Sequence, residues 1–145
     1  MSSRRKAREY ALHLLFQHDL GNNKPDEILP LFWKLNEADD TTRQFAEFLF
    51  REALRDKKNI DRLIRRHALH WRIERMSAVD RNVLRIAVAE FLSTSTPKVV
   101  VIDEAIEIAR KYSGDEATEF VNGVLDAIRI ELQGSPEKGG NERAD

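Results

Sequence analysis

The chain has 145 residues, a formal net charge of −1 and no cysteine. This length is sufficient for one hydrophobic core, and the lack of cysteine excludes a disulfide framework, a thiolate metal site and a cysteine nucleophile. Even the longest apolar runs, such as Val99 to Ile102, are far shorter than the roughly 20 residues that a membrane-spanning helix needs. The N-terminus has no apolar stretch typical of a signal peptide. We therefore expect a cytoplasmic protein with no membrane partner.

Charge is distributed along the chain in blocks of alternating sign. Residues 1–18 carry a net charge of +3, residues 26–50 carry −4, residues 51–85 carry +6 and residues 98–133 carry −4. Such blocks indicate a basic face on a protein whose overall charge is close to zero. The alternative for residues 51–85 is that most charges pair with each other along solvated helix faces.

Hydrophobic residues recur near every 3.6 positions, which predicts helices along almost the whole chain. The first helix is expected over about residues 3–19, and a short second one over residues 25–35. A third begins at Thr41 or Thr42, and its register changes near residues 56–59. The stretch that follows has arginines on its far side and an apolar stripe made of Ile60, Leu63, Ile64, His67 and Trp71.

The second half of the chain continues the helical pattern. Ser77 to Asp80 is typical of a capping box, and it opens a helix to about Ser93. Residues 99–102 have strand propensity, but helical spacing continues from them to Tyr112, so we predict a helix. A last helix covers residues 117–132. We expect an all-α domain of about seven helices over residues 1–132, with halves at about 1–70 and 77–132, and a disordered tail at 134–145.

The chain lacks the patterns that accompany common catalytic sites. It has no glycine-rich phosphate loop, no nucleophile elbow and no HExxH zinc motif. His67 and His70 have a spacing that could hold a metal, but no third ligand has an evident place beside them, which favours packed or hydrogen-bonded histidines. We predict neither an enzyme nor a cofactor or metal site.

Four basic residues surround the first turn of the first predicted helix: Arg4, Arg5, Lys6 and Arg8. The helix dipole disfavours cations at this end, so their presence indicates a polyanion that supplies the compensating charge. Single-stranded RNA fits better than duplex DNA, because no recognition helix or basic zipper is visible. The alternative is a flexible arm that only improves solubility.

Three parts of the sequence resemble the NusB family of bacterial transcription antitermination factors. They are RRKAREYAL at residues 4–12, DRNVLRIAVAE at residues 80–90, and the C-terminal pair PKVVVIDEAIEIA at 97–109 and FVNGVLD at 120–126. Their order and spacing over about residues 4–132 carry the resemblance, whereas residues 20–70 resemble the family only in their helical pattern.

The resemblance implies two helical bundles packed side by side and a function without catalysis. NusB-like proteins pair with NusE, which is also a small-subunit ribosomal protein. The pair binds the single-stranded boxA element of nascent ribosomal RNA, and the complex joins RNA polymerase and suppresses termination. By resemblance, therefore, the partners are boxA-type RNA, NusE and the RNA polymerase antitermination complex.

The resemblance also implies roles for single residues. The basic residues Arg4, Arg5, Lys6 and Arg8 would contact RNA phosphates, and Asp80 matches a position that meets NusE. Glu74 is a further partner candidate. Three residues of the last predicted helix complete the RNA-binding set: Glu116, Phe120 and Asn122.

Each of these residues has a simpler alternative role. Phe120 lies at the edge of the apolar stripe, where it could stack an unpaired base or could be a peripheral core residue. Asn122 faces outward and could read base edges, although asparagine is common on surfaces. Asp80 could cap its helix rather than meet a partner, and both roles are compatible.

Two alternative functions stay open. The first is a non-catalytic helical homodimer, because some NusB-like proteins self-associate through the face that would otherwise hold RNA. The second is an RNA-binding domain like the one that precedes the catalytic domain of ribosomal RNA cytosine methyltransferases. A complete methyltransferase is not expected, because the chain has no cofactor-binding half.

Overall fold

The computed structural model describes residues 3–134, which form seven α-helices, one short 3₁₀ helix and no strand. The all-α fold class predicted from the sequence is confirmed. In chain order the helices are α1 (Ser3–Gly21), α2 (Pro25–Leu35), α3 (Asp40–Arg55), α4 (Lys57–His67), η1 (Ile73–Arg75), α5 (Ala78–Ser93), α6 (Lys98–Ser113) and α7 (Asp115–Gln133). Residues 135–145, most of the tail expected to be disordered, lie outside the described part of the chain.

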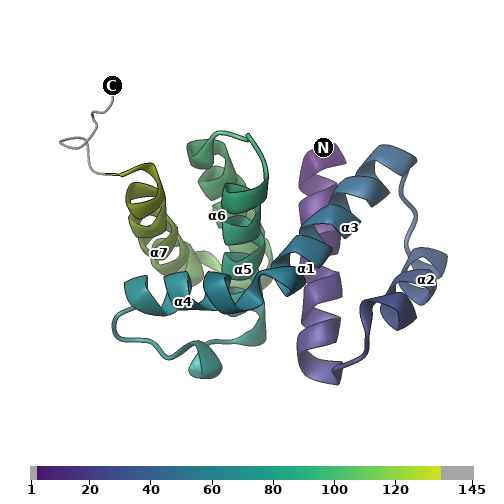
Figure 1. Ribbon diagram of the computed structural model, residues 1–145, viewed down its shortest axis with the longest axis horizontal. Coiled ribbons are helices and arrows are strands. Elements are labelled where there is room, and N and C mark those ends of the chain that lie inside the picture. The colour runs from purple at the N-terminus through teal and green to yellow at the C-terminus, as the bar shows by residue number, and fades with distance from the viewer. Residues whose placement is uncertain (1–2, 135–145) are drawn as a thin grey trace.

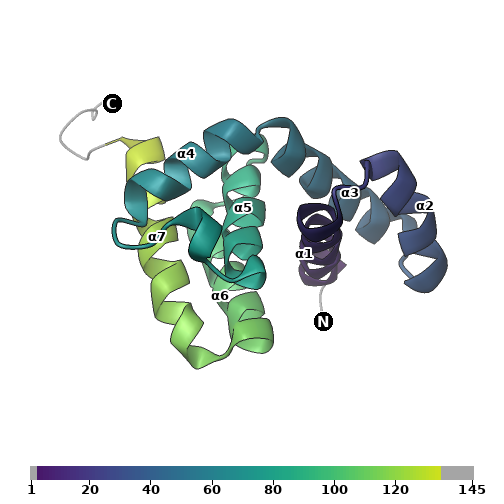
Figure 2. The ribbon, with the colours of Figure 1, turned by 90° about the horizontal axis from the view of Figure 1, so that it is seen from below.

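The helices form two groups that lie side by side (Figure 1). Helix α1 packs against α2 and α3 in one group, and α5, α6 and α7 pack against one another in the second. Helix α4 lies within residues 1–70, which were expected to form the N-terminal half, but it packs mainly against α5 and α7 of the second group. Seen from below, α3 and α4 run along one edge of both groups and meet at Asp56 (Figure 2).

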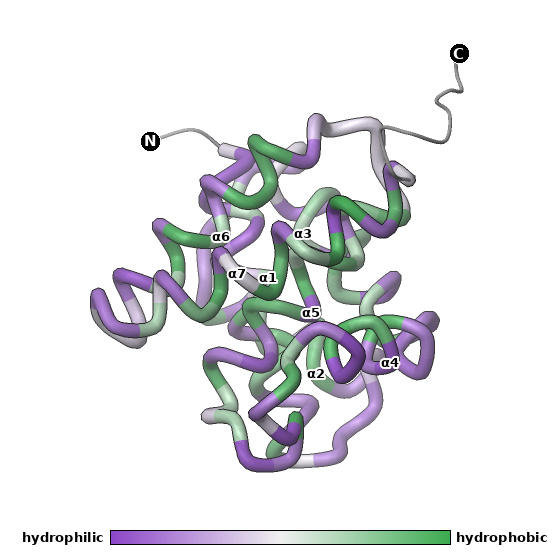
Figure 3. Tube along the Cα trace, turned by 90° about the vertical axis from the view of Figure 1, so that its left-hand side faces the viewer, coloured by the Kyte–Doolittle hydropathy of each residue, from purple (hydrophilic) through white to green (hydrophobic). Residues whose placement is uncertain are grey.

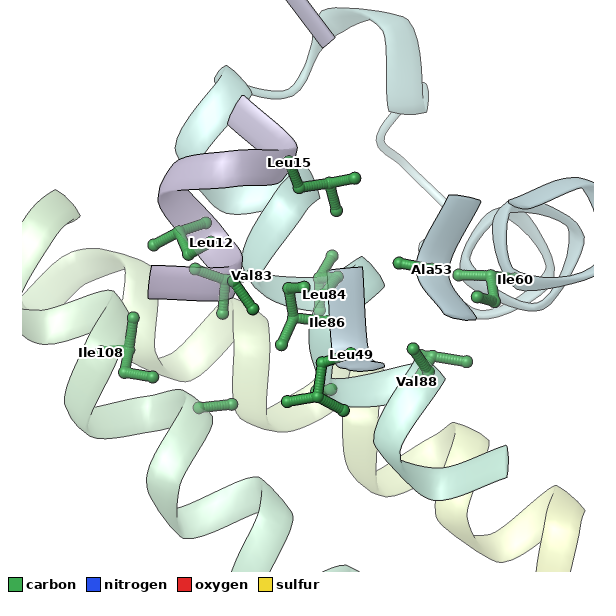
Figure 4. Packing of buried hydrophobic residues seen from close by; sticks show 14 of the residues in the cluster. Leu12, Leu15, Leu49, Ala53, Ile60, Val83, Leu84, Ile86, Val88 and Ile108 are labelled. Carbon is green, nitrogen blue, oxygen red and sulfur yellow. The ribbon is translucent and has the colours of Figure 1, made fainter. Parts of the chain in front are cut away.

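Helix α5 joins the two groups through a shared core. It contacts α1 and α3 on one side and α4, α6 and α7 on the other, and its ten residues from Asn82 to Phe91 are all buried. A helix surrounded in this way needs apolar side chains on every side rather than on one stripe. Figure 4 shows Val83, Leu84 and Val88 of α5 among side chains from the other helices.

Helix α1 is likewise buried around its whole circumference from Ala7 to Leu12, whereas most other helices bury one face. Hydrophobic and hydrophilic stretches alternate along the trace in Figure 3. None of the helices within residues 3–134 combines the length and apolarity that crossing a membrane demands. Burial of the apolar faces against α5 and against neighbouring helices therefore accounts for the periodicity seen in the sequence.

Helix ends explain where the sequence-based boundaries were right and where one was wrong. Helix α4 ends at His67, so Trp71 does not continue its apolar stripe, and the expectation that it does was wrong. At the start of α5 the Ser77 hydroxyl accepts a hydrogen bond from the Asp80 backbone N–H at 3.0 Å. The Asp80 carboxylate does not complete the predicted capping box; it accepts a hydrogen bond from the Ser113 hydroxyl at 2.7 Å.

Candidate nucleic-acid interface

Two of the four N-terminal cations are exposed in the first turn of α1. The Arg4 guanidinium lies 3.9 Å from the centre of the Phe45 ring, and the Lys6 ammonium lies 4.9 Å from the centre of the Tyr10 ring. The first turn of α1 contains no acidic residue. A ring face holds a cation in place without neutralising its formal charge. Arg4 and Lys6 therefore present positive charge to solvent at a helix end that the dipole already makes positive.

The other two N-terminal cations bind carboxylates of the C-terminal group of helices. Arg8 is only 6% exposed, and its Nε and Nη2 atoms donate to the two carboxylate oxygens of the fully buried Glu90, at 2.8 and 2.7 Å. Arg5 is half-buried and makes the same bidentate contact with Glu104 at 2.8 and 2.9 Å. The hydrogen bond from Arg5 lowers the pKa of Glu104 below its ordinary value.

These two ion pairs join helices that lie far apart in the sequence. Arg8 and Glu90 connect α1 to α5, and Arg5 and Glu104 connect α1 to α6. Sequence reasoning missed both glutamates, because their partners are 82 and 99 positions away. The available signal was Glu90 itself, since a carboxylate within an apolar run must find a partner when the run is buried.

A second part of the candidate interface is an aromatic pocket between the α4–η1 loop and α7. The Trp71 and Phe120 rings meet edge to face with their centres 5.7 Å apart, and Trp71 is 59% exposed. Arg75 and Glu116 also line the pocket, whose volume is about 400 Å³. Phe120 is half-buried and packs against the core, so Trp71 is the more accessible ring. An aromatic ring beside a guanidinium can stack an unpaired base, a contact that contributes about 1–3 kcal/mol. We call this site the Trp71–Phe120 pocket.

The structure brings some of the predicted residues together at this pocket and leaves others apart. Glu116, Phe120 and Asp80 all line it. Asn122 is exposed, but two residues after Phe120 it points to a different side of α7. Glu74 is exposed on the other side of η1, where it accepts a hydrogen bond from Arg65 at 3.1 Å. Sequence reasoning missed Trp71 as a pocket residue, because its spacing placed it in the core.

Asp80 also stands next to an apolar pocket on the surface between α1, α5 and α6. This pocket has a volume of about 360 Å³ and is lined by Leu12, His13, Phe16, Gln17, Val79 and Tyr112. The buried Glu9 lies beneath its rim, where its carboxylate accepts hydrogen bonds from Lys111 at 3.0 Å and from the Tyr112 hydroxyl at 3.3 Å. We call this site the Phe16 pocket.

The two histidines with metal-like spacing lie in different environments. The His67 Nε2 atom is 2.6 Å from a carboxylate oxygen of Glu131, whereas His70 is exposed. Across residues 3–134 no three histidine, aspartate or glutamate side chains are grouped so as to hold a metal ion.

Comparison with known proteins places this arrangement in a family. The model of the NusB family matches residues 5–129. The transcription antitermination protein NusB of Koribacter versatilis is 48% identical over 138 residues, which cover 94% of each chain. The protein of the same name from Solibacter usitatus is 44% identical over 91% of this chain and 92% of its own length.

Solved structures agree with the sequence comparisons. A crystal structure of the antitermination factors NusB and NusE in complex with double-stranded RNA matches with a TM-score of 0.80 and 33% identity, over 90% of this chain and 98% of the other. The solution structure of NusB from Aquifex aeolicus matches with a TM-score of 0.79 and 30% identity over the full length of both chains.

Proposed function

Because this chain belongs to the NusB family, we propose that it is an RNA-binding transcription antitermination factor that acts together with NusE. Its RNA is the single-stranded boxA element of nascent ribosomal RNA, and the complex acts on RNA polymerase in the cytoplasm. The protein works by binding alone and catalyses no reaction. The names of the relatives support antitermination, and the matching NusB–NusE structure supports RNA and NusE as partners.

One observation carries the RNA part of this proposal: exposed cations and an exposed aromatic pocket occur in the same molecule. Arg4 and Lys6 offer charge to phosphates, and Trp71 and Phe120 offer ring faces to bases. In a duplex the bases stack on one another and do not reach protein rings, whereas unpaired bases do. A duplex can therefore bind the cations through its phosphates but cannot stack its bases on the rings. A single strand can do both.

The geometry supports two different roles among the four N-terminal cations: direct phosphate contact and positioning of the first turn of α1. Arg4 and Lys6 contact phosphates directly, because they are exposed and neither faces an acid in the first turn of α1. Arg8 is a positioning residue, since its guanidinium is buried against Glu90. Arg5 connects the same turn to α6 through its ion pair with Glu104. Its side chain is partly exposed and belongs to the same helical turn as Arg4 and Lys6.

The salt dependence of RNA binding tests this division. Replacing Arg4 and Lys6 with glutamine should lower the slope of log K against log salt by about 1.4, since each phosphate contact on a single strand contributes ~0.7. The matched control replaces Lys24 and Lys34, two exposed lysines at α2, with glutamine and removes the same charge. Equal slopes for the two double variants would contradict direct phosphate contact at Arg4 and Lys6.

The Phe16 pocket supports the assignment of NusE as the protein partner. It is an open apolar site next to Asp80, and apolar pockets with a charged rim are typical of protein interfaces. Asp80 lines the Trp71–Phe120 pocket and its neighbour Val79 lines the Phe16 pocket, so NusE at the Phe16 pocket and RNA at the aromatic pocket would lie next to each other.

A further inference from the structure

The outward side of α4 and the loop behind it form an unusually basic surface. Residues 57–75 contain seven basic side chains, and all of them are exposed. The same stretch contains two acids, and one of them, Asp61, is buried and binds Arg85 at 2.8 and 3.1 Å. We call this set the α4 basic surface; its members are Lys57, Lys58, Arg62, Arg65, Arg66, Arg72 and Arg75.

Most of this charge is not neutralised by the protein. Arg65 binds Glu74, and Arg66 binds Glu131 of α7. Arg62 donates a hydrogen bond to the uncharged Asn59 side chain. Within residues 3–134 no ion pair is formed by the other five, which are Lys57, Lys58, Arg62, Arg72 and Arg75. A solvated helix face whose charges pair internally would leave few such cations. The surplus therefore indicates an external polyanion.

The cations of α4 are aligned on one face. At about 100° per residue, Lys58, Arg62 and Arg65 fall within an arc of about 60°, on the side opposite the buried Ile60 and Ile64. The rise from Lys58 to Arg65 is about 10 Å, so the three form a short row along the helix axis. Such a row suits a linear chain of phosphates better than it suits a single small anion.

This surface is continuous with the Trp71–Phe120 pocket. Arg75 lines the pocket on one side of η1, and Glu74 on the other side holds Arg65 at 3.1 Å. Trp71 itself lies in the loop that connects α4 to η1. A nucleic acid strand that leaves the pocket across η1 therefore arrives directly at the cations of α4.

We infer that the α4 basic surface binds the phosphate backbone of RNA that extends beyond the nucleotides held at the Trp71–Phe120 pocket. An acidic protein is the weaker candidate, because protein interfaces are built around an apolar centre and the row of cations on α4 has none. The exposed hydrophobic side chains nearby, Leu69 and Trp71, lie in the loop behind the helix and not among these cations. The inference rests on the proposed RNA-binding function and adds an expectation about RNA length. The protein should contact nucleotides beyond the boxA element itself.

The test compares two RNAs and two matched variants. The RNAs are a short single-stranded boxA-type oligonucleotide and the same element extended with uridines at both ends. One variant replaces Lys58 and Arg62 with glutamine, and the control replaces Lys24 and Lys34, which removes equal charge from the opposite end of the molecule (Figure 2). A third variant, Arg62→Lys, keeps the charge. Binding is measured across salt concentrations, and folding is checked by circular dichroism.

We expect the wild-type protein and the Lys24/Lys34 control to bind the extended RNA more tightly than the short one. The Lys58/Arg62 variant should bind the short RNA normally but lose about tenfold or more in affinity for the extended RNA, with a slope lower by about 1.4. Arg62→Lys should behave as the wild type. Equal binding of the extended RNA by both double variants, or no gain from the extension in the wild type, would overturn the inference.

Failure of the inference differs from failure of the proposed function. If the wild-type protein binds neither RNA, with or without a NusE-type protein, the proposed function itself is wrong. If it binds the short RNA, that binding depends on Arg4 and Lys6, and only the effect of Lys58 and Arg62 is missing, the function stands and the α4 basic surface has no role in it.

Discussion

The buried contact between Arg8 and Glu90 matters most at the scale of single residues. Both side chains are removed from water, and each satisfies the charge of the other through two hydrogen bonds. Taking two charges out of water is costly, so such a pair adds little net stability, but the loss of one member leaves an uncompensated buried charge. The pair therefore fixes the position of α1 relative to α5.

Substitution of either residue alone should be strongly destabilising. We expect Arg8→Ala and Glu90→Ala each to lower the free energy of unfolding by about 3–5 kcal/mol, as measured by urea denaturation. The double variant Arg8→Met, Glu90→Leu should lose much less, because it leaves no buried charge. If Arg8→Ala instead weakened RNA binding while the protein stayed as stable as the wild type, the positioning role of Arg8 would be refuted.

At the scale of elements, the contacts of α1 with α6 combine buried and exposed charges. Glu104 on α6 binds Arg5, and Lys111 further along α6 binds the buried Glu9 of α1. The pKa of Glu104 is lowered, first by the hydrogen bond from Arg5 and then by the nearby positive charges, against the opposing effect of its partial burial. This contact should therefore depend on pH.

Glu104→Gln should reveal that pH dependence. A carboxyl whose pKa is lowered by folding stabilises the folded state above its ordinary pKa of 4.5, and this contribution is lost as the pH falls through the lower folded-state value. The wild type should exceed Glu104→Gln in stability by at most about 1 kcal/mol at neutral pH, because Arg5 is partly exposed. The two melting temperatures should converge below pH 4.5. A difference that stays constant over that range would show that Arg5 does not act through the charge of Glu104.

For the whole molecule, the important relation is between two neighbouring pockets: Asp80 lines the Trp71–Phe120 pocket, and the preceding residue, Val79, lines the Phe16 pocket. The Phe16 pocket draws its lining from α1, α5 and α6, and the Trp71–Phe120 pocket draws its lining from residues 71–77, from α5, from the end of α6 and from α7. Because the net charge is close to zero, we expect the protein alone to bind RNA weakly. A protein partner at the Phe16 pocket could therefore raise the affinity for RNA.

We expect a NusE-type protein to raise the affinity for boxA-type RNA, and by linkage the RNA must raise the affinity for that protein by the same factor. Asp80→Lys should weaken partner binding and lose the coupling, while RNA binding by the protein alone should not decrease. Asp80→Asn is the control, because it keeps an acceptor for the Ser113 hydroxyl. Identical RNA affinities with and without the partner would rule out coupling. Light scattering across concentrations, with and without RNA, would reveal any self-association that competes with RNA binding.

The sequence by itself determined the helices and most of their ends. The apolar period of 3.6, the Ser77 cap and the break at Asp56 each depend on residues within about one turn, so local chemistry decides them. The resemblance to the NusB family, carried by short motifs, was also visible at this stage. The arginines on the outward side of α4 were also predicted correctly, because the residues opposite an apolar stripe on a helix face solvent.

Only the tertiary structure decided which charges are free and which rings meet. Arg4 and Arg8 look alike in the sequence, yet one faces solvent and the other faces Glu90, because spacing sets a direction around the axis of one helix and does not reveal what a distant helix places opposite it. Trp71 and Phe120 meet for the same reason: α4 ends at His67 and the loop behind it folds against α7. Contacts between residues far apart along the chain exist only after the helices pack around α5, and these contacts build the candidate site.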